Sequence, residues 1–351
     1  MVRGEVRDEA TLLMAVQTPP EPPLPTTVHY RKPVRNSVVW WLRCLGVLAF
    51  VIVLLTLPKS QAVHLAHIDL RWLGFCMFLT ILQLLLEAFV WQWLLSSQRI
   101  RHPYPKTLLA YLASQYLGVV TPGHVGEFLA AGYISMETGI TFGYALSSVV
   151  MKKVLTWVTV VSFGIWGLQL LPQVPFLKGL QWAVLMSVFV LVALSAGISV
   201  WVVSLRRLAK KWEKLSPWQV DMTEFRAGIR GLMSPALIAP LCVTAFSFGL
   251  LFLQIDAILH ALGIALSLAV VAKVVAFSRI VARVIPISVV GFGSKDAALI
   301  GMLYQHGIDP TVGLTVTVLF QMCSYLVMLL LSGLSWWIKP LVVRRIAPAK
   351  S

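Results

Sequence analysis

Charged residues are scarce in this sequence, and their scarcity excludes an ordinary soluble domain. Aspartate, glutamate, lysine and arginine together form 12% of the 351 residues, whereas a soluble domain carries about 25%. Hydrophobic residues form 58% of the chain and gather in long runs. Long apolar runs span membranes as helices, so the composition predicts an all-α polytopic membrane protein.

Acidic residues are scarcer than basic ones. The chain holds 14 acidic and 29 basic residues, which gives a formal net charge of +15. Such an excess can indicate a nucleic-acid partner. Here, however, lysine and arginine lie mostly in short loops beside the apolar runs, which is the pattern that membrane topology selects. We therefore expect no nucleic acid, and instead expect contacts with anionic lipid.

Cysteines are few, and the common catalytic motifs are missing. The chain has no Gly-rich phosphate loop ending in Lys-Ser/Thr, no GxSxG elbow and no HExxH pair, so we expect no cofactor and no metal. His64 and His67, with Asp69 nearby, leave a shared metal ion as the alternative for one loop. The cysteines stand singly in apolar segments, without the spacing of a metal site or a disulfide framework. They are Cys44, Cys76, Cys242 and Cys323.

Six apolar segments are long enough to cross a bilayer as helices, which takes about 20 residues each. They are Val38–Leu57, Leu70–Leu95, Thr141–Leu171, Leu180–Ser204, Pro235–Leu262 and Thr311–Trp337. Lysine and arginine gather beside alternate ends of these segments. This asymmetry predicts that both termini lie in the cytoplasm, and we expect the membrane to be the bacterial inner membrane.

The segments outside the spans have their own composition. The proline-rich residues 1–37 and the basic residues 339–351 are predicted to be cytoplasmic tails on either side of one transmembrane domain, residues 38–338. Apolar residues recur at helical spacing between the fourth and fifth spans, which predicts an interfacial helix, with a simple linker as the alternative. These residues are Trp218, Met222, Phe225 and Ile229.

A polar break at Thr121–Glu127 separates two short apolar segments, Leu108–Val120 and Phe128–Ile134. A helix rises about 1.5 Å per residue, so neither segment spans a hydrocarbon core of about 30 Å. We therefore predict a re-entrant hairpin that enters and leaves the membrane on the cytoplasmic side. Broken backbone is tolerated at membrane depth where it lines a cavity, so the hairpin predicts a pocket that includes Glu127.

A second break of similar composition occurs at Pro286–Asp296, before the short apolar segment Ala297–Tyr304. The distribution of lysine and arginine predicts that this second hairpin opens toward the outside of the membrane. The two broken-helix hairpins would then form an inverted repeat with a site between them. Helices beginning near Gly126 and Ser294 would offer free N–H groups to an anion. Ser294 and Asp296 are also typical of an ordinary helix cap, so both interpretations stay open.

Ionisable residues at membrane depth are a further signal, because each costs about 2.5–3.5 kcal/mol on insertion scales. The basic ones outnumber the acidic ones, which are Glu87, Glu127, Asp256 and Asp296. One interpretation is that these charges pair and hold the helices together. The other is that the surplus cations bind an anionic lipid. Under this second interpretation, the residues predicted to bind the lipid are Pro122, Gly123, His124, Gly126, Glu127, Lys152, Lys153, Arg279, Arg283, Pro286, Ser288, Gly291, Gly293, Lys295 and Asp296.

At these residues the sequence resembles the lysylphosphatidylglycerol synthase transmembrane-region family, also called flippase-like membrane proteins. The resemblance covers most of Val38–Trp337. It implies a helical membrane domain that binds or moves lipid headgroups, and that is sometimes fused to an aminoacyl-transfer domain with no counterpart in this sequence. It rests on Pro122–Glu127, on Ala145–Val150 with Lys152 and Lys153, and on Pro286–Ser288 with Gly291, Gly293, Lys295 and Asp296.

The sequence departs from the family pattern at several charged positions. His124 stands where the family often has arginine, and Ala130 and Ala131 stand where an arginine is common. The pair Lys152-Lys153 replaces Glu-Arg, and Lys295-Asp296 replaces Arg-Glu. Lysine offers a point charge where arginine offers a bidentate fork, so these departures bear on the identity of the substrate.

The predicted function is to bind an anionic, phosphate-bearing lipid and to translocate its headgroup between the leaflets. Two alternatives stay open. One is a membrane-embedded enzyme that modifies a lipid headgroup, with Glu127, His124 and Asp296 as acid–base residues. The other is a non-transporting anchor that partners a lipid-modifying or glycosyl-transferring enzyme through its basic loops.

Overall fold

Long apolar helices dominate the computed structural model, which describes residues 68–120, 122–167, 222–284, 288–289 and 292–338. Within these ranges, four helices are long and apolar enough to cross a membrane. They are α3 (Leu70–Ser97), α6 (Phe142–Gly167), α9 (Ile238–Ala261), which follows the short 3-10 helix η5 (Pro235–Leu237), and α12 (Pro310–Ile338). Helices at four predicted spans are therefore confirmed. The spans predicted at Val38–Leu57 and Leu180–Ser204, and both tails, lie outside the described residues.

The outward face of α3 is apolar. Five exposed aromatic and aliphatic residues recur every three or four positions, which places them along one side of the helix. They are Phe75, Phe78, Ile81, Leu85 and Phe89, each between 37% and 57% exposed. Such a stripe suits contact with lipid acyl chains. Together with the four long apolar helices, it supports an integral membrane protein.

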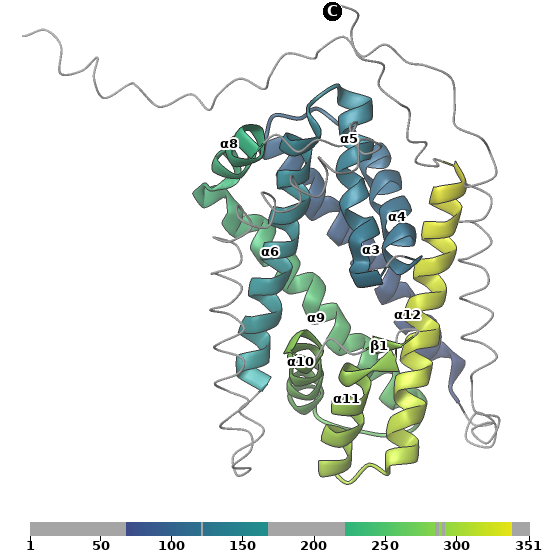
Figure 1. The fold of residues 1–351 in the computed structure, drawn as a ribbon. Coiled ribbons are helices and arrows are strands. Elements are labelled where there is room, and N and C mark those ends of the chain that lie inside the picture. Colours follow the sequence, from purple (N-terminus) through teal and green to yellow (C-terminus); the bar gives the residue numbers. More distant parts are fainter. Residues whose placement is uncertain (1–67, 121, 168–221, 285–287, 290–291, 339–351) are drawn as a thin grey trace, which may run out of the picture.

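The first hairpin is built from α4 (Tyr104–Val120), the 3-10 helix η2 (Pro122–Leu129) and α5 (Ala130–Thr138). Its longer leg, α4, has 17 residues and rises about 26 Å, so it falls short of the hydrocarbon core. The break folds back because η2 packs against α4. Figure 1 shows α4 and α5 in the same half of the bundle, as a re-entrant hairpin requires.

The tip of this hairpin differs from the prediction in one respect. The α-helix predicted to begin near Gly126 begins instead at Ala130, because η2 occupies the preceding eight residues. Gly126 lies at a point of close backbone approach. A Cβ on it would lie 2.7 Å from the backbone nitrogen of Gly118, and nearer still to the carbonyl group of Leu117. The tip is therefore a tightly packed backbone turn.

The second hairpin contains α10 (Leu268–Val284), the strands β1 (Ser288–Val289) and β2 (Phe292–Gly293), and α11 (Ser294–Gln305). The strands pair antiparallel, and they are the only strands among the residues that the structure describes. The predicted helix start at Ser294 is confirmed. At Gly293, however, φ is 175°, an extended conformation that any residue adopts. Gly293 therefore needs no left-handed backbone conformation.

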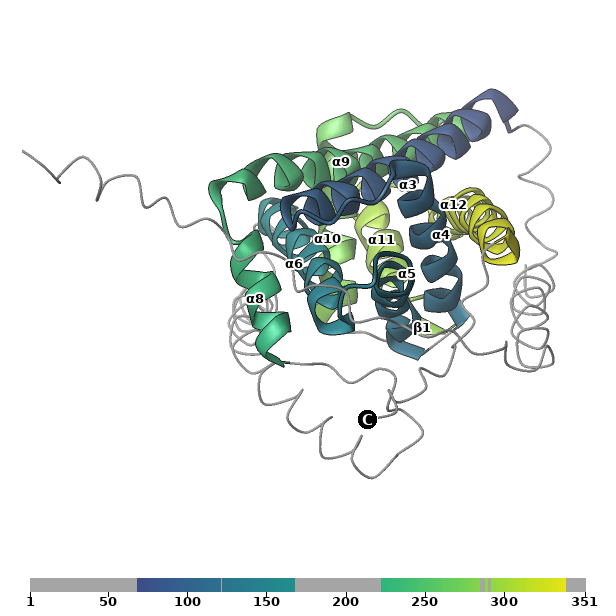
Figure 2. The ribbon, with the colours of Figure 1, turned by 90° about the horizontal axis from the view of Figure 1, so that it is seen from above.

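The two hairpins occupy opposite halves of the bundle. In Figure 1, α4 and α5 lie in the upper half, whereas α10 and α11 lie in the lower half. Viewed along the bundle in Figure 2, α5 and α11 lie between α6 on one side and α4 and α12 on the other. This arrangement agrees with hairpins that enter from opposite sides, while the inverted repeat as such stays a prediction.

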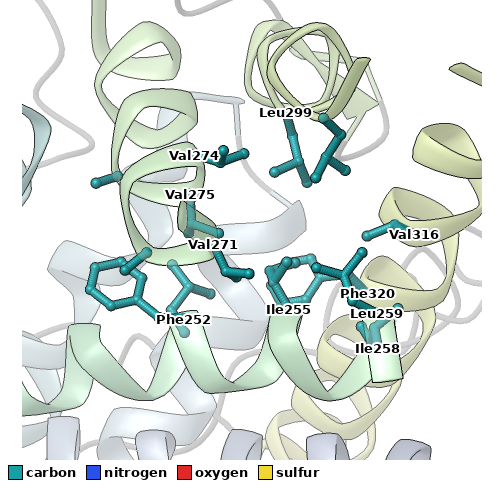
Figure 3. Close-up of a cluster of buried hydrophobic side chains, with 14 of the residues drawn as sticks. Phe252, Ile255, Ile258, Leu259, Val271, Val274, Val275, Leu299, Val316 and Phe320 are labelled. Atoms are coloured by element: carbon teal, nitrogen blue, oxygen red, sulfur yellow. The ribbon is translucent and has the colours of Figure 1, made fainter. Parts of the chain in front are cut away.

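The largest apolar core surrounds the second hairpin. Figure 3 shows side chains of α9, α10, α11 and α12 packed together, among them Ile255, Val274, Leu299 and Phe320. A separate cluster joins α3, α4, α5 and α6 around the first hairpin, with Trp91 and Ile134 nearly inaccessible. Each hairpin is thus held by its own packed shell of spanning helices.

The amphipathic segment before the fifth span forms α8 (Met222–Leu232), so these residues form a helix and not a simple linker. Its position at the membrane interface stays a prediction. It packs on α6, and its Phe225 is buried. Gln98, at the end of α3, donates to Ser147 Oγ of α6 at 2.6 Å and to the Gly228 carbonyl at 3.3 Å. α8 is therefore fixed to the end of the bundle where the first hairpin enters.

Candidate functional site

A cavity of about 200 Å³ lies beside the tip of the first hairpin. Its wall combines residues from five helices and the break, and it is mainly polar and aromatic. The lining residues are Glu87 and Trp91 of α3, Tyr111, Ser114 and Gln115 of α4, Glu127 of η2, Ala130 of α5, Val149, Lys152, Lys153, Thr156 and Trp157 of α6, and Arg283 of α10. The pocket predicted beside Glu127 is therefore present.

Glu87 is the centre of a polar cluster on one wall of this cavity. Its Oε2 accepts a hydrogen bond from the Tyr111 hydroxyl at 2.5 Å and forms an ion pair with Lys152 Nζ at 3.2 Å. Lys152 Nζ also lies 3.9 Å from the centroid of the Tyr111 ring. The lysine side chain is only 13% exposed. Glu87 and Tyr111 thus hold an almost buried cation in a fixed position.

The same cluster extends across the bundle to α9. Gln254, which is 1% exposed, donates from Nε2 to Gln83 Oε1 at 2.9 Å. Gln83 Nε2 in turn lies 3.5 Å from Glu87 Oε1. A buried amide is stable only when it finds such partners. The chain of contacts therefore links three spanning helices to the cavity wall.

At the break itself, Glu127 of η2 forms an ion pair with Lys153 of α6. The Glu127 side chain is 12% exposed and that of Lys153 is 37% exposed. Arg283 is near enough to interact electrostatically with Glu127, and its guanidinium lies 5.0 Å from the centroid of the Trp157 ring. Arg283 is itself exposed at the cavity. Arg283 thus brings the second hairpin to a cavity beside the tip of the first.

The other predicted cations gather elsewhere, beside α12. Arg279 lies 5.5 Å from the Phe320 ring centroid, and Lys295 Nζ lies 5.2 Å from the Tyr325 ring centroid. The carboxylate of Asp296 accepts a hydrogen bond from the Gly293 N–H at 2.9 Å, so it caps α11. Its other oxygen accepts from Gln321 Nε2 at 3.3 Å. For Asp296, the ordinary cap is the interpretation that the structure supports.

The structure therefore divides the predicted binding residues into groups. Glu127, Lys152, Lys153 and Arg283 meet at the cavity. Arg279, Lys295 and Asp296 belong to the second hairpin and do not line it. Gly126 and Gly293 belong to the two breaks as described above. Two of the remaining residues, Pro286 and Gly291, lie outside the part of the chain that the structure describes. For the other four only the backbone is described; they are Pro122, Gly123, His124 and Ser288.

Sequence reasoning missed three residues that shape the cavity, Glu87, Tyr111 and Trp157. The sequence does indicate that Glu87 needs a compensating partner, because it is a carboxylate at membrane depth. Nothing in its own helix indicates which residue that partner is. Tyr111 and Trp157 stand in apolar segments where aromatic residues are ordinary. Their roles depend on which helices are neighbours.

The interpretation that ionisable residues at membrane depth pair with one another holds for some of these residues. Glu87 with Lys152 and Glu127 with Lys153 are ion pairs between different elements. In the part of the chain that the structure describes, Arg279, Arg283 and Lys295 have no carboxylate oxygen within 4 Å. Three cations at membrane depth thus keep charge that these pairs do not neutralise.

Comparison with known proteins identifies one family. The family described as Lysylphosphatidylglycerol synthase TM region matches residues 40–332, which is most of the chain. No curated protein and no solved structure matches this chain.

Proposed function

Since this chain belongs to the lysylphosphatidylglycerol synthase TM-region family, we propose that it binds the phosphate-bearing headgroup of an anionic lipid in the cavity and translocates that headgroup between the leaflets. The family relates the chain to lipid handling in the membrane. Translocation of the lipid headgroup goes beyond this family relationship and is our proposal.

The charge of the cavity wall carries this proposal. Three cations, Lys152, Lys153 and Arg283, face two carboxylates, Glu87 and Glu127. Each lysine already has a carboxylate partner, whereas Arg283 has no carboxylate oxygen within 4 Å among the described residues. A guanidinium presents a planar fork of donors that suits phosphate. We therefore assign Arg283 as the principal phosphate contact.

The position of the cavity favours movement over simple storage. It lies where a helix is broken, and transporters commonly place their binding sites between such broken-helix segments. Its wall combines one residue of the second hairpin with the tip of the first. A displacement of either hairpin would therefore change the site itself, which is the coupling that alternating access requires.

Replacing Arg283 with glutamine tests the binding step. Loss of a charge-assisted contact weakens affinity by about 10–150-fold, and we expect a change in this range for short-chain phosphatidylglycerol, measured by calorimetry on purified protein. The thermal midpoint should change little, because no carboxylate lies within 4 Å of Arg283 among the described residues. Arg71→Gln, at an exposed position of α3, is the matched control. Unchanged lipid affinity with a lowered midpoint would reject the assignment.

A vesicle assay tests the movement. The purified chain is reconstituted with fluorescent phosphatidylglycerol, and transfer between leaflets is followed by quenching from outside. We expect transfer with the wild-type chain and slower transfer with Arg283→Gln. Conversion of the headgroup, detected by mass spectrometry, would favour the enzyme alternative. Lipid binding without transfer or conversion would favour the anchor alternative.

The orientation of the bundle is proposed from its charged ends. Exposed Arg99 and Arg101 lie between α3 and α4, and exposed Arg226 and Arg230 lie on α8. Figure 1 shows α8 in the same half of the bundle as α4 and α5 of the first hairpin. We infer that this end faces the cytoplasm. In a chain lacking its native cysteines, Ser97→Cys should react with an impermeant maleimide from the cytoplasmic side and Gln305→Cys from the outside. The reverse pattern would contradict this orientation.

A further inference from the structure

A second cavity lies where α3 ends and the chain turns into α4, at the foot of the first hairpin. Its volume is about 610 Å³, and its wall comes from the end of α3 and from the link to α4, residues 98–103. Exposed Arg99 and Arg101 line it, together with Gln92, Ser96 and His102. We call this cavity the basic groove. Among the described residues, it shares no lining residue with the cavity of the candidate functional site.

Arg99 has a left-handed backbone, which is unfavourable for a residue with a Cβ. Its φ is 60°, and it is the one non-glycine residue with a positive φ in the described part of the chain. In this conformation the Cβ comes too close to a carbonyl oxygen. Three other helices, α5, α9 and α11, are also followed by a left-handed residue, and each of them uses glycine there. These residues are Gly139, Gly263 and Gly307.

The turns after α3, α9 and α11 are otherwise alike. In each, an isoleucine follows the left-handed residue, and its N–H donates to the carbonyl five positions earlier. The distance is 3.0 Å for Ile100, 2.9 Å for Ile264 and 3.2 Å for Ile308. Glycine is the residue that such a turn favours. A positive charge that served topology alone could stand at a neighbouring position of the link. The reason for an arginine at position 99 therefore lies in where its side chain is placed.

Buried polar contacts hold the link in position. His102 is 5% exposed, and its Nε2 lies 2.9 Å from Glu137 Oε2 at the end of α5. Gln92 of α3 donates from Nε2 to the His102 carbonyl at 2.6 Å. Glu137 is thus engaged by the histidine. Within the described residues, no carboxylate oxygen lies within 4 Å of Arg99 or Arg101. The groove is therefore a fixed surface with two cations that no carboxylate neutralises.

The groove continues the apolar stripe of α3. Gln92 and Ser96 follow Phe89 at intervals of three and four residues, so they lie on the same side of the helix as the stripe. The helix rises about 16 Å from Phe78 to Phe89, which is about half of a hydrocarbon core of about 30 Å. One side of α3 thus presents an apolar strip about one leaflet long, followed by a polar and basic groove.

Aromatic residues mark the boundary between the stripe and the groove. The ring centroid of Phe89 lies 5.7 Å from that of Trp93 and 6.4 Å from that of Tyr104. Tryptophan and tyrosine are enriched where a membrane meets water, at the level of the lipid headgroups. The groove begins at this level. Its cations therefore lie where the phosphate of a membrane lipid would be.

We propose that the basic groove binds the phosphate group of an anionic membrane lipid whose acyl chains lie along the apolar stripe of α3. Arg99 and Arg101 contact the phosphate oxygens, because a guanidinium presents a planar fork of donors that matches them. The stripe removes the acyl chains from water and fixes the direction of the lipid. Since the groove is separate from the cavity of the candidate functional site, this inference does not depend on the proposed function.

Replacing Arg99 with glycine separates the side chain from the turn. Glycine relieves the left-handed strain, so the thermal midpoint of Arg99→Gly should equal or exceed that of the wild type. Its affinity for short-chain phosphatidylglycerol should fall about fivefold, as should that of Arg101→Gln, since this is the usual contribution of one arginine beside an anionic lipid surface. Calorimetry on purified full-length protein in a neutral detergent measures the affinity. A lowered midpoint in Arg99→Gly would show that the side chain has a structural role, contrary to the proposal.

The matched control is Arg230→Gln, which removes one exposed arginine from α8, outside the groove. It should bind the lipid as the wild type does. If Arg99→Gly and Arg101→Gln also bind as the wild type does, the groove is not a lipid site.

Measurements with and without Arg283→Gln separate the two sites. Arg283→Gln should leave a lipid-binding component that Arg99→Gly weakens. If Arg283→Gln abolishes all lipid binding, the groove is rejected and the proposed function stands. If Arg283→Gln has no effect and Arg99→Gly still weakens binding, the groove stands and the proposed function fails.

A titration with inorganic phosphate distinguishes a lipid from a free anion. Phosphate lacks the acyl chains that contact the stripe, so it should bind much more weakly than the lipid, and the lipid should displace it. Phosphate bound as tightly as the lipid in a manner that depends on Arg99 would overturn the assignment to a lipid.

Discussion

Replacing Gly126 with alanine is expected to destabilise the first hairpin and to abolish lipid transfer. The added Cβ would lie 2.7 Å from the Gly118 nitrogen and nearer to the Leu117 carbonyl group, and both neighbours are backbone atoms of α4. Backbone in a helix cannot move aside as a flexible side chain does. Overpacking of this kind costs about 1–3 kcal/mol. Because Glu127 follows directly, the shift should also displace its ion pair with Lys153 from the cavity.

Gly301→Ala is the matched control for this substitution. Gly301 lies within α11, and a Cβ there would meet no heavy atom within 4 Å. Alanine has the higher helix propensity, by about 1 kcal/mol, so this variant should be as stable as the wild type or more so. Thermal unfolding in detergent and lipid transfer in vesicles are measured for both. Full transfer by Gly126→Ala would show that the break serves only as a connection.

Removal of the Glu87 carboxylate is expected to have the other large effect. Glu87→Gln would leave Lys152, which is 13% exposed, without its ion-pair partner. Breaking a buried pair by removing one member costs about 3–5 kcal/mol. Glu87 is 34% exposed, so solvent screening reduces this cost, and we expect about 1–3 kcal/mol. Lipid affinity should also change, since an unpaired Lys152 is free to turn into the cavity.

A double-mutant cycle isolates the pair itself. Lys152→Met should cost less than Glu87→Gln, because Tyr111 would still donate to the carboxylate that remains. The combined variant should be more stable than the sum of the single changes predicts, by about 0.5–3 kcal/mol. Lys106→Met, at an exposed position near the start of α4, is the control for loss of a lysine. Additive effects would mean that Glu87 and Lys152 act independently.

Much of this protein follows from its sequence alone. Apolar runs of spanning length are sufficient to predict a helical membrane protein, because in hydrocarbon the backbone must satisfy its own hydrogen bonds. The same constraint located the first hairpin, since α4 is too short to span and Thr121–Glu127 is too polar and too rich in glycine and proline to continue it. The start of α11 at Ser294 was also predictable, because Asp296 is a typical capping residue.

The partners of the charged residues were decided only by the tertiary structure. A sequence shows that Glu87, Glu127, Lys152 and Lys153 need compensation at membrane depth, but which acid meets which base depends on how α3, η2 and α6 pack. The 3-10 helix at Pro122–Leu129 likewise results from packing against α4. Because of it, the α-helix begins at Ala130 and not near Gly126 as predicted. The division of the cations between Arg283 at the cavity and Arg279 and Lys295 beside α12 has the same origin. Local pattern determines that a helix forms and where it breaks, whereas electrostatic pairing depends on contacts between segments far apart in the chain.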